Sequence, residues 1–190
     1  ISENVQTGLP GDKDTFYGPL NNSSQMERVM KALTGLPKNA RIETGGQRKG
    51  SVGYFIEPTV VVTSNPHFRT MEEEIFGPVM TVYVYEDDMF LETMQILNET
   101  SPYALTGSIL SQDRYAIDLA CKTLQDTAGN FYINDKPTGA VVNQQPFGGA
   151  RGSGTNDKAG SQWNLIRWVS PRTIKETFVT PTNYRYPFLG

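Results

Sequence analysis

The pattern of hydrophobic and polar positions is clearest in the middle of the chain. Residues 79–85, 106–111 and 130–134 are short runs rich in β-branched and aromatic side chains, so they predict three strands. Between them, apolar residues recur at helical spacing. The helix-capping candidates are Asp87, Asp88 and Asp113. This strand–helix–strand–helix–strand order predicts an α/β fold with a parallel open sheet, right-handed crossovers, and a site beyond the carboxyl ends of its strands.

The first part of the chain predicts one helix and one further strand. Asn22 or Ser23 can cap a helix, and Gly35 and Pro37 end it. The glycine-rich stretch 45–53 favours an irregular or hairpin-like conformation. Residues 54–63 are strand-like, and Pro58 would keep that strand at a sheet edge or bulge.

The last third is mostly loop. Residues 135–160 are rich in Gly, Pro, Asn and Thr without a helical period, and a loop of this length is usually functional. The glycines within 148–154 predict a tight turn with unusual backbone angles rather than a phosphate loop, since no Lys-Ser/Thr follows them. Residues 175–179 predict a short strand before an aromatic tail.

Composition excludes several classes of function. The 190 residues carry a net charge of −3, which argues against nucleic acid or anionic lipid as a main partner. One His and one Cys exclude zinc fingers, haem attachment and a disulfide framework, and we expect no metal site. No run of about 18 apolar residues occurs in the sequence, so we predict no membrane span. The chain begins with Ile1, so we expect it to be processed or part of something longer.

Two residues that often carry chemistry have structural interpretations here. Cys121 shares the apolar face of a predicted helix, whereas a nucleophilic thiol needs exposure and a positive setting. His67 is a lone imidazole in a predicted loop, and we interpret it as a surface residue. A hydrolase that uses His67 stays open as an alternative, although no G-x-S-x-G motif accompanies it.

The acidic segment 72–79 (EEEIFGPV) is a stronger candidate. It turns abruptly through Ile-Phe-Gly-Pro into a predicted strand. A carboxylate fixed there could accept two hydrogen bonds from a vicinal diol, as acidic residues do with ribose in dinucleotide sites. The alternative interpretation is a solvated acidic run.

These motifs resemble the aldehyde dehydrogenase superfamily. The segment 73–79 (EEIFGPV) is similar to the hallmark segment of that superfamily, and 145–149 (QPFGG) with Ser153-Gly154 is similar to its P-F-G-G…S-G segment. Within the superfamily, the resemblance is to the Δ1-pyrroline-5-carboxylate dehydrogenases, and only to their C-terminal portion. Three further segments carry this narrower likeness: 129–135 (GNFYIND), 138–140 (TGA) and 153–158 (SGTNDK).

The resemblance implies roles for five residues. Glu74 would bind the nicotinamide-side ribose of NAD, and Phe76 would pack near the nicotinamide. Gly139 and Ala140 would bind the α-carboxylate of glutamate semialdehyde through backbone N–H groups, which can form a concave anion site. Some members have Ser at the position of Ala140, so we expect a weaker anchor here. Phe147 would form an apolar wall beside the substrate.

The implied reaction is the oxidation of glutamate semialdehyde to glutamate with NAD, in proline catabolism. A cysteine thiolate attacks the aldehyde, hydride leaves to the nicotinamide, and water hydrolyses the thioester. The family's nucleophile, its general-base Glu and its Gly-rich cofactor domain would all lie before Ile1. We therefore expect no catalytic residue in this chain, no activity from it alone, and the upstream half of the same enzyme as its partner. Asp157 and Lys158 receive no role.

The resemblance also implies organisation and location. Residues 1–170 would be the C-terminal part of the catalytic domain, and 171–190 an oligomerisation strand and tail, giving a homodimer or larger oligomer. A eukaryotic member would lie in the mitochondrial matrix, and another member in the cytoplasm. The choice between NAD and NADP stays open because the discriminating contacts lie upstream. A non-catalytic binding or assembly module with this fold is the alternative function.

Overall fold

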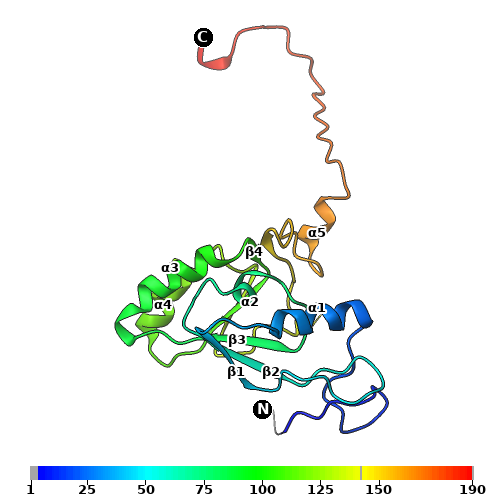
Figure 1. The fold of residues 1–190 in the computed structure, drawn as a ribbon. Helices are drawn as coiled ribbons and strands as arrows, with labels where there is room; N and C mark the ends of the chain where they lie inside the picture. Colours follow the sequence, from blue (N-terminus) through cyan, green and yellow to red (C-terminus); the bar gives the residue numbers. More distant parts are fainter. Residues whose placement is uncertain (1–3, 142, 190) are drawn as a thin grey trace.

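A three-stranded sheet covered by one helix forms the first half of the molecule (Figure 1). The computed structural model describes residues 4–141 and 143–189. The sheet has the order β1 (Ala40–Thr44), β2 (Thr59–Thr63) and β3 (Val79–Tyr83). β1 runs antiparallel to β2, and β3 runs parallel to it. Helix α1 (Ser23–Leu33) packs against this sheet.

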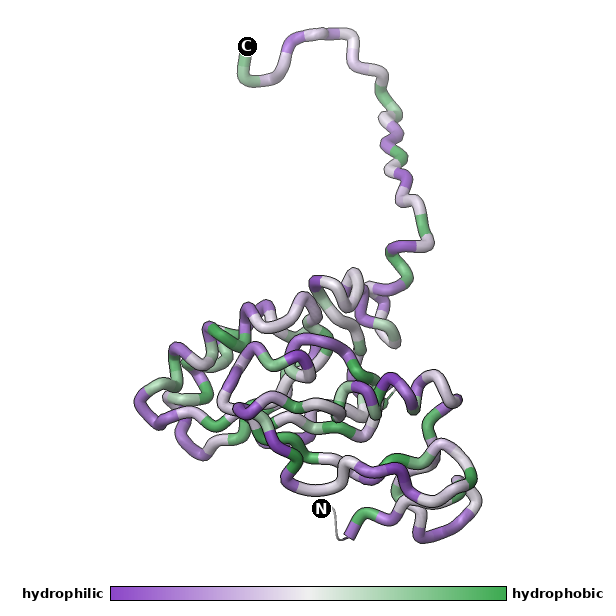
Figure 2. Tube along the Cα trace, viewed as in Figure 1, coloured by the Kyte–Doolittle hydropathy of each residue, from purple (hydrophilic) through white to green (hydrophobic). Residues whose placement is uncertain are grey.

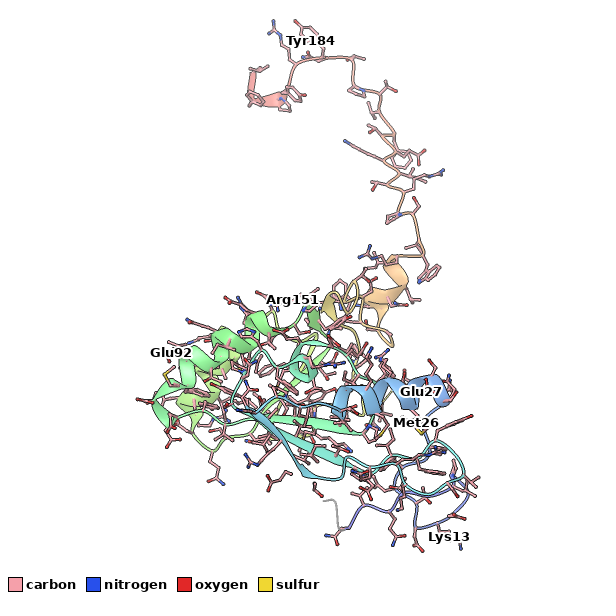
Figure 3. The ribbon with its side chains drawn as sticks, viewed as in Figure 1. Lys13, Met26, Glu27, Glu92, Arg151 and Tyr184 are labelled. Atoms are coloured by element: carbon pink, nitrogen blue, oxygen red, sulfur yellow. The ribbon has the colours of Figure 1, made fainter. Side chains whose placement is uncertain are left out.

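The sequence of α1 explains both its start and its buried face. Asn22 is the N-cap, and its side chain accepts a hydrogen bond of 2.9 Å from the backbone N–H of Gln25. Met26 and Val29 face the core, whereas Glu27 is exposed (Figure 3). The helix and its cap are therefore confirmed. The buried residues of this core are Met26, Val29, Ala32, Leu33, Ile56, Val61, Phe68 and Ile75.

Two parallel strands and two helices form the second half. β5 (Thr106–Ile109) pairs in parallel with β6 (Asn130–Ile133), as the sequence predicted. Helix α3 (Phe90–Thr100) follows a single 3₁₀ turn, η1 (Asp87–Met89), and lies beside α4 (Arg114–Thr123) (Figure 1). The core between these elements contains Met94, Ala120 and Leu124, with Phe90, Ile109 and Phe131 packed against it.

A capped helix and several short elements complete the fold. The Asp113 side chain caps α4 by accepting from the N–H groups of Tyr115 (2.8 Å) and Ala116 (3.4 Å), as predicted. β4 (Tyr103–Ala104) pairs antiparallel with β7 (Ala150–Arg151). The remaining elements are α2 (Arg69–Glu72), α5 (Gln162–Ile166) and the 3₁₀ helix η2 (Pro187–Leu189).

The α/β class is confirmed, but the three strands predicted from 79–85, 106–111 and 130–134 do not form one sheet within the part of the chain that the structure describes. β3 pairs with β2, and β5 pairs with β6, so the segments predicted from 79–85 and 106–111 are not neighbours among the described residues. A groove of 850 Å³ lies between them, and both Thr81 of β3 and Ser108 of β5 line it. A helix crossover fixes that two strands run parallel, but it does not require them to be adjacent.

The strand expected at residues 54–63 is also corrected. Only Thr59–Thr63 forms the strand, and it is the central strand of its sheet rather than an edge. Pro58 lies directly before it, where its missing N–H costs no ladder hydrogen bond. Ile56 makes only an isolated bridge to Arg48 within the irregular glycine-rich region.

The predicted strand at 175–179 is not formed. The chain from Ser170 to Arg185 contains no helix or strand and extends away from the body (Figure 1). Figure 2 shows hydrophobic and hydrophilic residues mixed along this extension, and Phe178 is 92% exposed. A lone strand has no ladder to satisfy its backbone groups, so an isolated chain does not stabilise one here. Positions 1–3, 142 and 190 of the expected domain ranges lie outside the described residues.

Candidate functional site

Helix α1 holds the turn that carries two of the predicted site residues. Gln25 and Arg28 lie on one face of α1, three residues apart. The Gln25 amide donates to the backbone carbonyls of Ile75 (2.8 Å) and Phe76 (2.6 Å). The Arg28 guanidinium donates to the carbonyl of Glu74. Two side chains of one helix thus bind three successive carbonyls, which fixes the path of the turn.

Packing and backbone conformation orient the same turn. Ile75 is buried in the core, so the side chains on either side of it, those of Glu74 and Phe76, lie at the surface. Phe76 has a φ of 58° and is 74% exposed, an unusual combination for a bulky residue. Gly77 follows with no room for a side chain, because an added Cβ would lie 2.6 Å from Val29 Cγ2. Such strained, over-determined backbone is typical of functional positions.

Glu74 lines a cavity of 510 Å³ with mixed charge. The lining residues are Arg28, Arg69, Glu72, Glu73, Glu74, Ile75, Pro102 and Tyr103. A carboxylate beside a guanidinium offers both an acceptor and a donor to a polyhydroxylated ligand, and charge-assisted hydrogen bonds of this kind are the strong ones. This set of donors and acceptors is of the kind that a vicinal diol can bind.

The same cavity adjoins the glycine-rich loop. Tyr103, in the cavity wall, pairs with Arg151 of β7. The Ala104 N–H donates to the Ser153 hydroxyl at 3.0 Å. Arg151 also donates to the carbonyl of Asn98, in the last turn of α3, at 2.7 Å. These contacts connect the wall beside Glu74 to the loop that contains the other predicted site residues.

The predicted substrate residues lie in the loop after β6. Gly139 has a φ of 81°, a conformation that favours glycine, and a Cβ added there would lie 3.5 Å from Lys136 Cε. Ala140 and Phe147 are half-buried, and Phe147 bridges antiparallel to Ala159. Gly139 does not line the Glu74 cavity. The structure therefore brings Glu74 and Phe76 together, and Gly139 with Ala140 forms a separate feature in the loop that leads to Phe147.

The glycines of 148–154 serve close packing more than unusual angles. Only Gly154 has a positive φ, 146°, whereas the non-glycine Arg151 has a φ of 51°. An added Cβ at Gly149 would lie 2.6 Å from Ser153 Cβ. The tight turn was predicted correctly, but close approach explains the glycines better than backbone angles do.

Sequence reasoning gave no role to two residues that the structure places inside this loop. Lys158 is half-buried, and its ammonium group donates to the Gly129 carbonyl and to Asn130 Oδ1 (3.3 Å). Burial lowers the pKa of Lys158. Hydrogen bonds from Thr155 and from Arg167 lower the pKa of the Asp157 carboxyl. The signal in the sequence was only their position in the segment 153–158, directly after the glycines.

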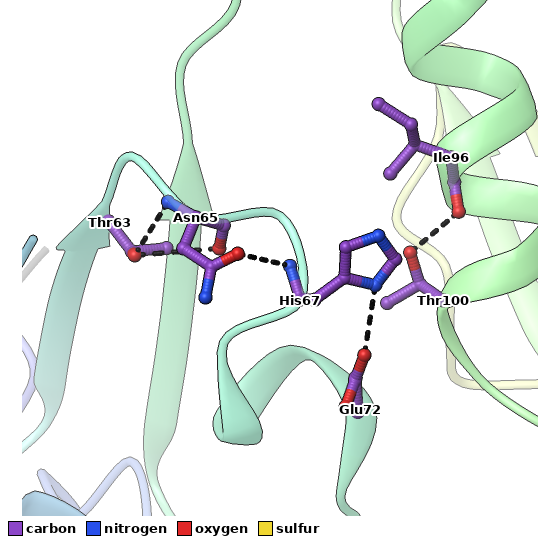
Figure 4. Close-up of polar contacts among 6 residues, drawn as sticks. All are labelled: Thr63, Asn65, His67, Glu72, Ile96 and Thr100. Carbon is purple, nitrogen blue, oxygen red and sulfur yellow. Dashed lines mark hydrogen bonds and ion pairs between the residues drawn. The ribbon is translucent and has the colours of Figure 1, made fainter.

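His67 and Cys121 keep the structural interpretations expected of them. His67 is exposed, and its Nδ1 lies 2.9 Å from Glu72 Oε1 (Figure 4). The nearby hydroxyls of Thr63 and Thr100 donate to backbone carbonyls rather than to the imidazole. Cys121 is half-buried on α4. No hydrolase arrangement forms around His67 within these contacts.

Within residues 4–141 and 143–189, no group of three or more His, Cys, Asp or Glu is arranged to hold a metal ion. Across the helices described there, none combines the length and apolar character needed to cross a membrane.

Comparison with known proteins decides the family. The profile of the Aldehyde dehydrogenase family matches residues 2–174, most of the chain. The chain belongs to the aldehyde dehydrogenase family. The parallel-sheet fold with flanking helices is the aldehyde dehydrogenase type, as the solved relatives also show.

Several relatives of this aldehyde dehydrogenase chain are named Δ1-pyrroline-5-carboxylate dehydrogenase. The chain is 64% identical to the mitochondrial Δ1-pyrroline-5-carboxylate dehydrogenase of Dictyostelium discoideum, over 98% of this chain and 34% of that protein. It is 44% identical to the mitochondrial enzyme of that name from Homo sapiens, over 97% of this chain and 33% of that protein. The resemblance found in the sequence is confirmed.

A solved structure agrees with these relatives. The Mycobacterium tuberculosis Δ-pyrroline-5-carboxylate dehydrogenase bound with NAD matches with a TM-score of 0.82 and 41% identity, over 100% of this chain and 34% of that chain. The aldehyde dehydrogenase chain therefore spans about a third of the length of the relatives it matches.

Proposed function

We propose that this chain forms one part of an NAD-dependent dehydrogenase that oxidises glutamate semialdehyde to glutamate in proline catabolism. The observation that carries the proposal is the turn at Glu74 and Phe76, which α1 fixes at the wall of a charged cavity. The relatives named Δ1-pyrroline-5-carboxylate dehydrogenase, one of them solved with NAD, support the substrate and the cofactor. In a eukaryote, we place the enzyme in the mitochondrial matrix, as several relatives are named mitochondrial.

Each proposed site residue has a separate task. Glu74 accepts hydrogen bonds from the ribose hydroxyls next to the nicotinamide, and Phe76 packs beside that ring. When bound, NAD supplies the hydride acceptor. Gly139 and Ala140 present backbone N–H groups to the substrate carboxylate, and the positive φ of Gly139 suits a concave anion site. Phe147 covers the aliphatic part of the substrate.

The groove between β3 and β5 supports a site that is completed by other polypeptide. It is lined largely by apolar side chains, and Leu110 at its edge is 75% exposed. An open groove with such a lining offers a surface on which other polypeptide can pack. We propose that the remainder of the same enzyme covers the groove and brings the nucleophilic cysteine. Cys121 does not serve as the nucleophile in this proposal, because it is half-buried on helix α4.

The chain alone is expected to be inactive. Incubation with NAD and glutamate semialdehyde should produce no NADH above background, because the nucleophile and the rest of the cofactor site are missing. Absorbance at the NADH band measures this directly. The intact enzyme, assayed in parallel, should produce NADH. Turnover by the chain alone would contradict the proposed division of the site, and an inactive intact enzyme would contradict the proposed reaction.

The extended tail is proposed to join a neighbouring subunit. Residues 171–190 are the expected oligomerisation segment. Tyr184 in it is largely exposed (Figure 3), and so is Phe188. An extended, partly apolar segment pairs readily with the edge of another sheet. Sedimentation of the intact enzyme should give a dimer or larger species. Deletion of 171–190 should shift the sedimenting species toward the monomer. An intact enzyme that sediments as a monomer would count against this assignment.

A further inference from the structure

We propose that Asn130 and Tyr132 are positioning residues, which hold Phe147 in place and thereby set the affinity of the pocket for its aldehyde substrate. The proposal rests on the proposed function, because it assumes that Phe147 covers the substrate. Neither residue is required to touch the substrate. Their action passes through the backbone on both sides of Phe147 and through the side chain of Gln145.

The side-chain amide of Asn130 binds the residues before and after Phe147. Asn130 Nδ2 donates to the carbonyl of Pro146 at 3.0 Å. Asn130 Oδ1 accepts from the N–H of Gly148 at 3.2 Å. One amide therefore uses its donor and its acceptor on two peptide groups that flank a single residue. Aspartate would keep the acceptor and lose the donor, and alanine would lose both.

Tyr132 adds a third contact from the same face of the strand. Its hydroxyl donates to Gln145 Oε1 at 2.9 Å. Residues two apart in a strand share a face, so Asn130 and Tyr132 both point to the loop. Phe131, between them, points to the opposite side and packs against the core of α3 and α4. β6 thus joins a rigid core on one face to the loop segment 145–148 on the other.

The opposite side of Phe147 is held by the next segment of the loop. The N–H of Phe147 donates to the carbonyl of Ala159 at 3.0 Å, and the N–H of Ala159 donates back at 2.8 Å. Lys158 connects the two sides, because its ammonium donates to Asn130 Oδ1 at 3.3 Å and to the carbonyl of Gly129. Hydrogen bonds therefore hold the backbone of Phe147 on both sides.

The cofactor turn has separate support. Gln25 and Arg28 of α1 hold Glu74 and its neighbours, without any contact to Asn130 or Tyr132. Loosening the β6 contacts should therefore affect the aldehyde and leave NAD binding unchanged. A general loss of structure would affect both.

The test is steady-state kinetics on the intact enzyme. Tyr132→Phe, which keeps the ring and the fold, should raise the KM for glutamate semialdehyde about threefold, as expected for one lost hydrogen bond. Asn130→Ala should raise it on the order of 30-fold, with Asn130→Asp between the two. The KM for NAD should stay within about twofold of wild type for every variant. Asn21→Ala, at an exposed position before α1, is the matched control and should change neither KM.

Three outcomes would overturn parts of this account. An unchanged KM for glutamate semialdehyde in both Tyr132→Phe and Asn130→Ala would overturn the positioning role while leaving the proposed function intact. An equal rise in the KM for NAD, or a fall in kcat with no change in KM, would show a merely structural role. Wild-type enzyme that does not oxidise glutamate semialdehyde would overturn the proposed function, and the positioning role with it.

Discussion

In the intact enzyme, Glu74→Ala is expected to weaken NAD binding about 100-fold, because two hydrogen bonds to a carboxylate, each of about 1.5 kcal/mol, would be lost. Glu74 is exposed at the wall of the charged cavity, where a ribose can reach it. Glu74→Gln keeps the shape but not the charge, so its effect should be smaller, about tenfold. Calorimetric titration with NAD measures the affinity, and the KM for NAD should rise in parallel.

The neighbouring glutamate provides the control. Glu73 is exposed as well and lines the same cavity. Its Oε2 lies 3.8 Å from Arg69 Nη2 in a surface ion pair. Such pairs contribute little, so Glu73→Gln should leave NAD affinity within about twofold. Equal losses from Glu73→Gln and Glu74→Gln would indicate a general effect of cavity charge and would refute a specific contact at Glu74.

Gly129→Ala is expected to destabilise the enzyme by about 3 kcal/mol or more, the upper range for overpacking. A Cβ added at Gly129 would lie 1.9 Å from the carbonyl oxygen of Gly148 and 2.8 Å from Asn156 Oδ1. The first of these atoms belongs to the backbone and cannot rotate away. The start of β6 and the loop that contains Phe147 would have to separate. Thermal denaturation and soluble yield measure the loss.

Gly11→Ala is the matched control for this substitution. No atom lies within 4 Å of a Cβ added at Gly11, and its φ is not in the positive range. Its effect on stability should be within about 0.5 kcal/mol, as for most surface substitutions. If Gly129→Ala proved as mild as Gly11→Ala, the close approach of β6 to Gly148 would be refuted.

Local elements were predictable where local physics decides them. Asn22 and Asp113 cap the helices at which they were expected, because a side-chain oxygen that binds exposed N–H groups acts within three residues. The strands around 106–109 and 130–133 were predicted from β-branched and aromatic runs. The parallel pairing of β5 with β6 followed from the helix between them.

Strand neighbours were less predictable. β1 was missed, because the alternation of half-buried and exposed residues in Ala40–Thr44 is short and sits beside the glycine-rich stretch. The separation of β3 from β5 could not be inferred, since pairing depends on every strand available to a sheet and not only on sequence order. The strand at 175–179 depends in the same way on an edge that the isolated chain does not provide.

In the candidate site, too, contiguous motifs were predictable and long-range contacts were not. The motif that contains Glu74 and Phe76 was recognisable by its residues alone, and so was the segment with Phe147. Lys158 received no role because a lysine in a polar loop is usually solvated. Its contact with Gly129 and Asn130 joins positions almost thirty residues apart, and a local pattern contains no information about such a contact.

The sequence by itself determined the family, the α/β class, the caps of α1 and α4, and the residue types that we propose bind a diol and a carboxylate, because these follow from interactions within a few residues or from contiguous motifs. The cap predicted at Asp87 or Asp88 is wrong, because both residues lie in the 3₁₀ turn η1 and the N-cap of α3 is Met89, which makes no side-chain cap hydrogen bond. Only the tertiary structure decided which strands are neighbours, that α1 holds the turn at Glu74, and that β6 holds the chain around Phe147. Those features depend on hydrogen bonds and packing between segments that are distant in the sequence. Which segments pair depends on how the whole chain packs its core, and no local pattern contains that information.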